Sequence, residues 1–234
     1  MTEGTRARAK GEATAARGIP QADLLKALKQ AAAGDCPVLS LPVGRPVLAL
    51  LRSVAPAGSP RHARDVELIT EWRNLHPRCF MTEFVATCER TARWLAEQVV
   101  PDDRRILFLL DQLDGCSLGH MGLVADWEEG FGEADAILRG RDGLPGVMGE
   151  ALTTLMTWAR DGLGLKRIGL RVRSDNPQAV RFYKRLGLVE TSRVPLRRRQ
   201  EKDRLCWIED PGAEPEAGVS SIHMTWSGGS GSGR

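Results

Sequence analysis

Residues 131–189, FGEADAILRGRDGLPGVMGEALTTLMTWARDGLGLKRIGLRVRSDNPQAVRFYKRLGLV, decide the fold. Their pattern predicts a strand, a Gly-rich turn, a helix, a strand, a turn, a helix and a strand. Apolar residues recur at three- and four-residue steps from Val147, so the first helix should begin there and end near Gly162 or Gly164. Alternation of arginines with apolar residues over 167–173 predicts the strand that follows.

The turn at 139–149 leads into the first helix and holds Gly140, Gly143, Gly146 and Gly149. A Gly-rich turn that opens a helix lets backbone N–H groups surround an anion, and the helix dipole favours negative charge there. The turn is therefore a candidate cradle for a pyrophosphate. The alternative is that the glycines only make the turn tight.

The second helix should begin at Pro177. Asn176 is a favoured N-cap, and proline is favoured at the first helical position. Tyr183 lies on the face of this helix that we expect to be buried, and Gly187 should end the helix.

Residues 176–188, NPQAVRFYKRLGL, resemble the GCN5-related N-acetyltransferase superfamily, whose members show an Asn, an Ala, a Phe-Tyr pair and a Gly before an apolar residue at this spacing. The resemblance covers roughly residues 46–226 and is sharp over 131–189. It implies an α/β fold with a mixed, mostly antiparallel sheet of six to seven strands. Four helices should flank this sheet, and one pair of parallel strands should splay apart.

Composition excludes several classes of protein. The net charge of +3 is a small difference between 33 basic and 30 acidic residues, which does not suggest a nucleic-acid partner. The five cysteines are odd in number and lack CxxC spacing, so we expect neither a disulfide framework nor a metal site. No apolar run approaches the roughly 20 residues of a membrane span, and the N-terminus has no apolar signal core. We therefore expect a cytoplasmic protein without a membrane partner.

The remaining elements follow from local signals. We expect a disordered extension at 1–18, a short helix and linker at 19–45, an acetyltransferase domain at 46–226 and a flexible Gly/Ser tail at 227–234. The helix at 21–33 could pack on the domain, mediate dimerisation or stay free. Within the domain we expect helices at 63–75 and 82–99, and strands at 47–54, 105–111, 117–125, 188–196, 205–208 and 220–226.

The resemblance implies acetyl-CoA as co-substrate, bound between strands 131–139 and 166–173. The pantetheine arm would bond to the main chain of the first of these strands, and the pyrophosphate would bind to amides of the turn. Leu144 and Val147 depart from the usual basic residue and first glycine of this turn, and Arg139 or Arg141 could replace the missing cation. The implied cofactor contacts are Ile137, Leu138, Arg139, Gly146, Val147, Met148, Gly149 and Asn176.

Tyr183 is the candidate general acid, because family members commonly use this tyrosine to protonate the departing CoA sulfur. It is the single tyrosine of the chain. Glu133 and Asp135 are candidate bases for the substrate ammonium, since alternation puts them on one side of their strand. Asp126, Glu128 and His120 are further candidates. A main-chain N–H near Ala136 or Ile137 would stabilise the oxyanion if that strand bulges.

The acceptor should meet the two helices after the first strand. Relatives that acetylate amino sugars often carry Trp-Arg-Asn here, so Trp72 could stack on a sugar and Arg73 could bind a phosphate or carboxylate, with Asn74 beside them. The alternative is that Trp72 is a core residue and Arg73 a surface residue.

These features predict an acetyl-CoA-dependent N-acetyltransferase that acts on a primary amine of a small molecule: an amino sugar, an aminoglycoside or a biosynthetic amine. One alternative is a protein N-terminal or lysine acetyltransferase, which would need an open groove. A second is a non-catalytic acyl-CoA-binding module, which the presence of Tyr183 argues against. We expect a monomer or homodimer.

Overall fold

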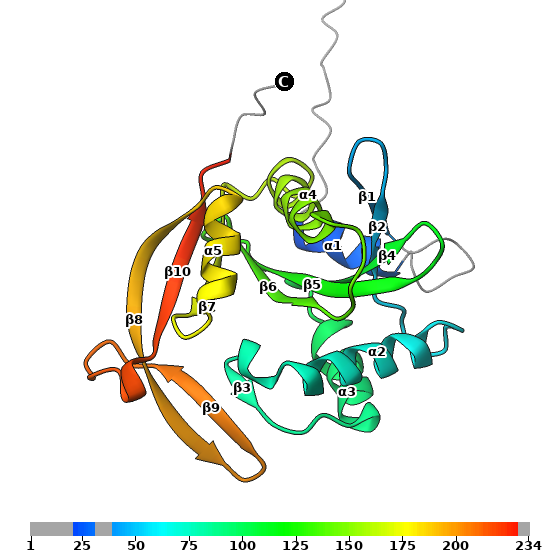
Figure 1. Ribbon diagram of the computed structural model, residues 1–234. Coiled ribbons are helices and arrows are strands. Elements are labelled where there is room, and N and C mark those ends of the chain that lie inside the picture. Colours follow the sequence, from blue (N-terminus) through cyan, green and yellow to red (C-terminus); the bar gives the residue numbers. More distant parts are fainter. Residues whose placement is uncertain (1–20, 31–38, 229–234) are drawn as a thin grey trace, which may run out of the picture.

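The computed structural model describes residues 21–30 and 39–228 (Figure 1). Its strands join in one sheet in the order β1-β2-β4-β5-β6-β7-β10-β8-β9-β3. The helices are α1 (Gln21–Gln30), α2 (His62–Leu75), α3 (Cys88–Trp94), α4 (Val147–Asp161) and α5 (Pro177–Arg185). The strands are β1 (Ser40–Val43), β2 (Ala49–Ser53), β3 (Thr82–Glu83), β4 (Arg105–Gln112), β5 (Ser117–Asp126), β6 (Phe131–Arg139), β7 (Arg167–Arg173), β8 (Leu188–Glu201), β9 (Arg204–Glu209) and β10 (Ser220–Trp226).

Helices cover both faces of the sheet, α4 and α5 on one and α2 and α3 on the other (Figure 1). Alternation along the strands produces the two layers. In β4, Phe108 faces the apolar cluster that contains α4 and Tyr183, whereas Leu107 and Leu109 face the cluster that contains Trp72 and Leu95. We call these the cofactor face and the acceptor face.

The parallel strands β6 and β7 separate after a short paired stretch, as the family resemblance implied. They pair at Phe131↔Arg167, Gly132↔Ile168 and Glu133↔Gly169. Beyond this point, and among the described strands, the β7-facing edge of β6 has no further partner, although β6 continues to Arg139. The main-chain groups of this edge are therefore free to bond to a ligand.

Strand β6 contains a bulge, the feature on which the expected oxyanion donor depends. Pairing with β5 shifts between His120 and Gly122, where two residues of β6, Ala136 and Ile137, lie opposite one of β5. Ala136 has a φ of 47°, in the left-handed region. The bulge therefore falls at the residues that the sequence indicated.

Most predicted elements of residues 105–226 are present, including β7 and β10 at the expected bounds and Asn176 as the N-cap of α5. The sheet is larger than expected, because β1 lies in the expected linker and β3 pairs with β9. The helix predicted at 82–99 starts later. Thr82 belongs to β3, and Thr87 caps α3 by accepting a hydrogen bond from the Arg90 amide.

Helix α1 packs on the domain. Leu25 is fully buried, and the Lys29 ammonium donates hydrogen bonds to the carbonyls of Val99, Asp102 and Arg105. Our expectations for residues 1–18, for the end of this helix and for most of the C-terminal tail lie outside the described residues. Within 21–30 and 39–228, no helix is long and apolar enough to cross a membrane.

Candidate active site

The Gly-rich turn leads from β6 to the start of α4 on the cofactor face. Gly146 precedes the helix with a φ of 79°, a conformation that glycine adopts without steric cost. A side chain at Gly149 would meet Leu186 and Phe182 of α5, so the small residue lets α5 approach the start of α4 closely. The first turn of α4 therefore lies next to α5.

Tyr183 lies on the buried face of α5. Only 7% of its surface is exposed, and it packs in the same cluster as α4. Burial raises the pKa of Tyr183 well above its ordinary value, so its phenol keeps its proton at neutral pH. Asn176 caps the same helix by accepting a hydrogen bond from the Ala179 amide at 3.1 Å.

The two candidate bases lie on the acceptor face and differ in their partners. Glu133 makes a bidentate ion pair with Arg171, at 2.7 and 3.1 Å. Asp135 makes one contact, at 3.2 Å, with the Arg105 guanidinium. Burial raises the pKa of Asp135 to about 6, with the Glu133 charge adding to the rise. Asp135 is therefore closer in pKa to a working base than an ordinary aspartate.

His120 is not suited to act as the base. It is 2% exposed, and burial lowers its pKa to about 4. Its Nδ1 lies 2.6 Å from the Ala136 carbonyl, and its ring stacks on Trp72 at a centroid distance of 6.1 Å. It therefore contacts the bulge rather than the open side of the acceptor face.

The Trp-Arg-Asn motif has a structural role on the acceptor side, through Trp72, Arg73 and Asn74. Trp72 has no exposed surface, so this geometry does not support the predicted stacking on a sugar. Arg73 lies between the Phe80 and Phe84 rings and donates hydrogen bonds to the Thr82 carbonyl and hydroxyl. Asn74 bonds to both main-chain groups of Ala86. The motif thus holds the segment between α2 and α3 in place.

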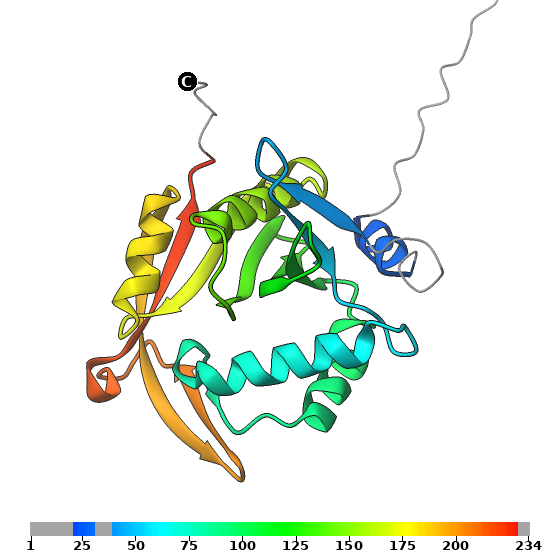
Figure 2. The ribbon, with the colours of Figure 1, turned by 45° about the vertical axis from the view of Figure 1, so that its right-hand side comes forward.

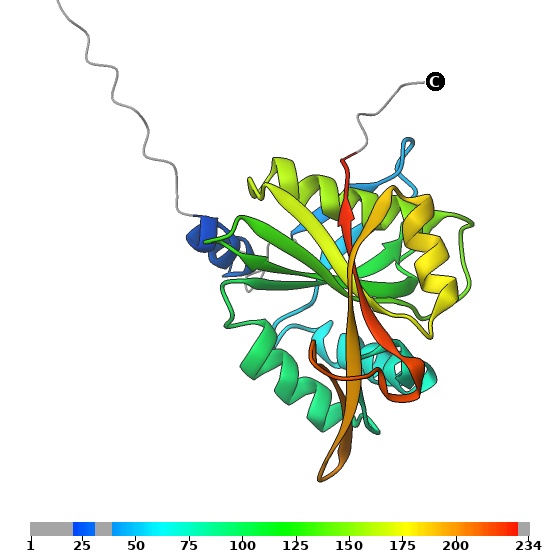
Figure 3. The same cartoon turned by 90° about the vertical axis from the view of Figure 1, so that its left-hand side faces the viewer.

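That segment reaches across to β7 and β9. Glu83 accepts a hydrogen bond from Arg173 at 2.7 Å and another from the Trp207 indole at 2.8 Å. β3 and β9 pair at Thr82↔Cys206 and Glu83↔Leu205. Figures 2 and 3 show the β8–β9 hairpin extending from the sheet on the side of α2 and α3. On the acceptor face, the segment that contains β3 therefore connects α2 with β7 and β9.

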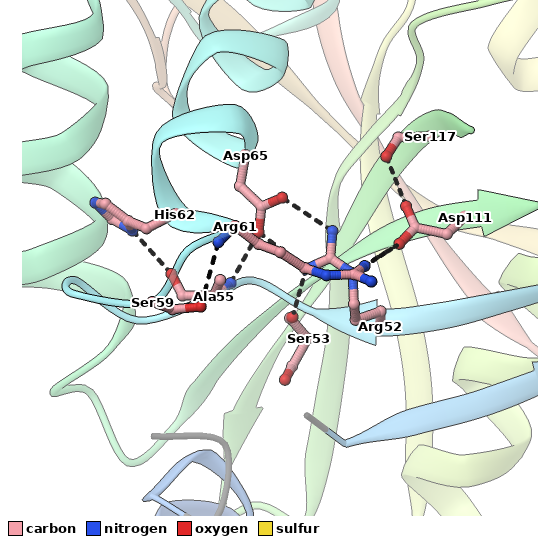
Figure 4. Close-up of polar contacts among 9 residues, drawn as sticks. All are labelled: Arg52, Ser53, Ala55, Ser59, Arg61, His62, Asp65, Asp111 and Ser117. Carbon is pink, nitrogen blue, oxygen red and sulfur yellow. Dashed lines mark hydrogen bonds and ion pairs between the residues drawn. The ribbon is translucent and has the colours of Figure 1, made fainter. Parts of the chain in front are cut away.

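A buried ion-pair cluster anchors the start of α2 (Figure 4). The Arg52 guanidinium bonds to Asp65 at two atoms, both at 2.9 Å, and to Asp111 at 2.6 Å. Ser117 donates to the other Asp111 oxygen at 2.6 Å. The cluster ties α2 to β2, β4 and β5, and so fixes the helix that carries Trp72.

The sequence did not identify Glu83, Arg105 or Arg171 as partners of the site. Alternation over 167–173 placed Arg171 opposite the apolar residues, which was the available signal. Glu83 and Arg105 carried none, because their importance comes from contacts with segments distant in the chain.

The parted parallel strands agree with the fold that the resemblance to N-acetyltransferases implies, and β6 bulges at the opening. Residues 59–189, more than half of the chain, match the family model described as "Acetyltransferase (GNAT) domain". The chain belongs to the GNAT acetyltransferase family. It is therefore an N-acetyltransferase that uses acetyl-CoA to acetylate an amine.

Solved structures of low sequence identity share the fold. The spermidine N-acetyltransferase of Vibrio cholerae, in complex with CoA and spermine, is 16% identical with a TM-score of 0.58, over 76% of this chain and 94% of that chain. A GNAT family acetyltransferase from Bacillus anthracis is 13% identical with a TM-score of 0.58, over 80% and 97%. A search of the curated proteins found no match.

Proposed function

We propose that this protein transfers the acetyl group of acetyl-CoA to a primary amine of a small molecule, by direct attack of the amine on the thioester. The main support is the division of the site between two faces. Tyr183 packs on the cofactor face, and Asp135 lies on the acceptor face with the open edge of β6 between them. Asp135 can then take a proton from the amine on one side, while Tyr183 gives a proton to the departing thiolate on the other.

In this proposal, Asp135 accepts the proton of the substrate ammonium, directly or through water. The freed amine attacks the thioester carbon, and the Ile137 amide in the bulge donates to the oxyanion. The C–S bond then breaks and Tyr183 protonates the sulfur, while the nitrogen loses its second proton as the amide forms, and a proton from solvent restores the phenol. Glu133 is a weaker candidate for the base, because both of its carboxylate oxygens already accept hydrogen bonds from Arg171.

The residues that we propose to bind acetyl-CoA are the same ones that the family resemblance implied. Pantetheine would bond to the main chain of Ile137, Leu138 and Arg139, and the pyrophosphate to the amides of residues 146–149. Asn176 would add a contact from the start of α5. Arg139 and Arg141 lie exposed at the turn, which suits contact with phosphate.

The bridge of β3 and β9 favours a small acceptor over a peptide. A protein substrate needs a groove in which an extended chain can lie. Here the segment after α2 is tied to Arg173 of β7 and to β9, which narrows the approach to the open strands. The Vibrio cholerae neighbour, with spermine in its complex, is consistent with a small amine. A protein N-terminal or lysine acceptor remains the second candidate.

The charges on the acceptor face favour a cationic amine without phosphates. On this face the guanidiniums of Arg105, Arg171 and Arg173 each contact a carboxylate. Arg171 and Arg173 each contact two. The carboxylates involved are Glu83, Glu133, Asp135, Asp175 and Glu209. A nucleotide-linked amino sugar would have to compete with these carboxylates, whereas an ammonium would be attracted by them.

A panel of amines with acetyl-CoA, followed by release of free thiol, tests the proposal. The panel contains a diamine, an aminoglycoside, a nucleotide-linked amino sugar and an N-terminal peptide. We expect the diamine or aminoglycoside to give the highest kcat/KM. Faster reaction of the peptide would establish the second candidate. Acetyl-CoA binding without thiol release from any amine, including lysine-containing peptides, would contradict the proposal.

A further inference from the structure

We propose that His120 is a positioning residue that aims the oxyanion donor of the β6 bulge. This inference rests on the proposed function, but it concerns a residue outside the assigned acid, base and cofactor contacts. The residue lies on β5, one strand away from the open edge of β6.

The first observation is the bond between the ring and the bulge. A carbonyl oxygen can only accept, so the Nδ1 of His120 carries the hydrogen that it donates to Ala136 at 2.6 Å. Ala136 is the bulge residue with φ 47°. The bond therefore holds the carbonyl of the one peptide unit in β6 that departs from strand geometry.

The second step follows from peptide geometry. In a planar trans peptide, the C=O of one residue and the N–H of the next point in opposite directions. The Ala136 carbonyl points to His120, on the face where Trp72 lies. The Ile137 N–H accordingly points away from that face, toward the side that carries Tyr183 and on which we propose that acetyl-CoA binds.

The third observation is that the histidine ring is itself fixed. It stacks on the fully buried Trp72, and Gly140 packs so closely on the Trp72 ring that an added methyl group would overlap it. The cofactor turn, Trp72, His120 and the bulge therefore form one rigid chain of contacts. The Trp-Arg-Asn motif contributes to this chain through its tryptophan.

The fourth observation separates this role from simple packing. The Nε2 of His120 is buried and has no hydrogen-bond partner among the described residues. Burying such an acceptor costs free energy, so packing alone would be served better by an apolar ring. The Nδ1 bond to the bulge is the contact that an apolar ring could not make.

Three substitutions of His120 test whether a donor at the place of Nδ1 is required. His120→Asn keeps a nitrogen donor at the place of Nδ1, His120→Gln moves the donor one bond outward, and His120→Phe keeps the stacking but removes the donor. We expect the Gln and Phe variants to lose kcat by about 100-fold, the scale of one oxyanion donor. The Asn variant should stay within about ten-fold of wild type, and the KM for acetyl-CoA should change little in all three.

An infrared measurement tests the same inference without any acceptor. The carbonyl stretch of isotope-labelled acetyl-CoA should shift to lower frequency on binding to wild type and to His120→Asn. It should return toward its solution value in the Gln and Phe variants, while thermal melting shows that these remain folded. Retention of the shift or of wild-type kcat in the Gln or Phe variants would overturn the inference. Absence of the shift in wild type would overturn it too, whatever the amine panel reports.

Discussion

At the scale of single residues, the proposed mechanism depends on the protonation states of two groups, Tyr183 and Asp135. Burial keeps Tyr183 protonated, as a general acid must be. Burial also brings the pKa of Asp135 to about 6, so that the carboxylate that exists at pH 7 has a stronger affinity for a proton than an exposed aspartate has.

Replacement of Asp135 by Asn should lower kcat by about 10²- to 10⁴-fold, because a positioned base contributes on that order. In wild type, Asp135 is protonated below its pKa and cannot accept a proton. We therefore expect kcat to rise with pH through about 6 and to level off above it. Glu133→Gln is the matched control: kcat should still rise with pH, but with a lower midpoint, because the Glu133 charge adds to the rise in the pKa of Asp135. A profile unchanged in Asp135→Asn would contradict the assignment.

Tyr183→Phe should lower turnover ten-fold or more while leaving the acetyl-CoA Kd nearly intact, because only the phenol is removed. Since the pKa of Tyr183 is raised, ionisation of this group should cause no loss of wild-type activity up to its ordinary pKa of about 10. Rates and calorimetric binding on the two proteins check both statements. Unchanged turnover would remove the acid role.

At the scale of elements, the position of α2 depends on the buried cluster around Arg52. Arg52→Met leaves Asp65 and Asp111 buried without their main cation, and breaking a buried pair in this way costs about 3–5 kcal/mol. Arg64→Ala, which removes an exposed ion pair with Glu67, should cost about 1 kcal/mol or less. Urea unfolding of the wild type and the two variants measures both losses of unfolding free energy. Equal losses would show that the cluster does not anchor the helix.

Gly140 lets the turn after β6 pack closely against Trp72 of α2. A methyl group at this position would overlap the Trp72 ring, so Gly140→Ala should displace the turn and raise the KM for acetyl-CoA, with about 1–3 kcal/mol lost from stability. Gly212 has open surroundings, and Gly212→Ala is the control. Steady-state kinetics and thermal melts compare the two variants. An equal KM for acetyl-CoA and an equal Tm would mean that contact with Trp72 does not set the position of the turn.

Sequence patterns predicted the elements whose signals are local. The strand 167–173 alternates strictly, and the cap at Asn176 is followed by proline, so β7 and α5 appear at the expected residues. The prediction at 82–99 was wrong only over its first residues, because apolar spacing cannot distinguish the start of a helix from a two-residue strand followed by a loop. Partners such as Arg105 for Asp135 depend on strand pairing across the sheet, which no local pattern contains.

At the scale of the whole molecule, segments from distant parts of the chain contact one another on the acceptor side. Glu83 links β3 to Arg173 of β7 and to Trp207 of β9. The hairpin of β8 and β9 therefore enlarges the sheet, and in our proposal it also limits the size of the acceptor. This arrangement explains why the size of the substrate should depend on contacts remote from the reacting atoms.

Glu83→Gln should raise the KM for the amine roughly ten-fold, equivalent to about 1.4 kcal/mol, because the charge that holds Arg173 is lost. The KM for acetyl-CoA should change far less. Glu201→Gln, at the exposed tip of the same hairpin, is the control. Equal changes in both KM values would indicate a general loss of structure instead of a specific effect on the acceptor side.

A crystal structure of the protein with CoA tests the central claim most directly. The account predicts pantetheine between β6 and β7, bonded to the main chain of residues 137–139, with its sulfur within about 3.5 Å of the Tyr183 hydroxyl. CoA bound outside this opening, or a sulfur on the acceptor face away from Tyr183, would contradict it.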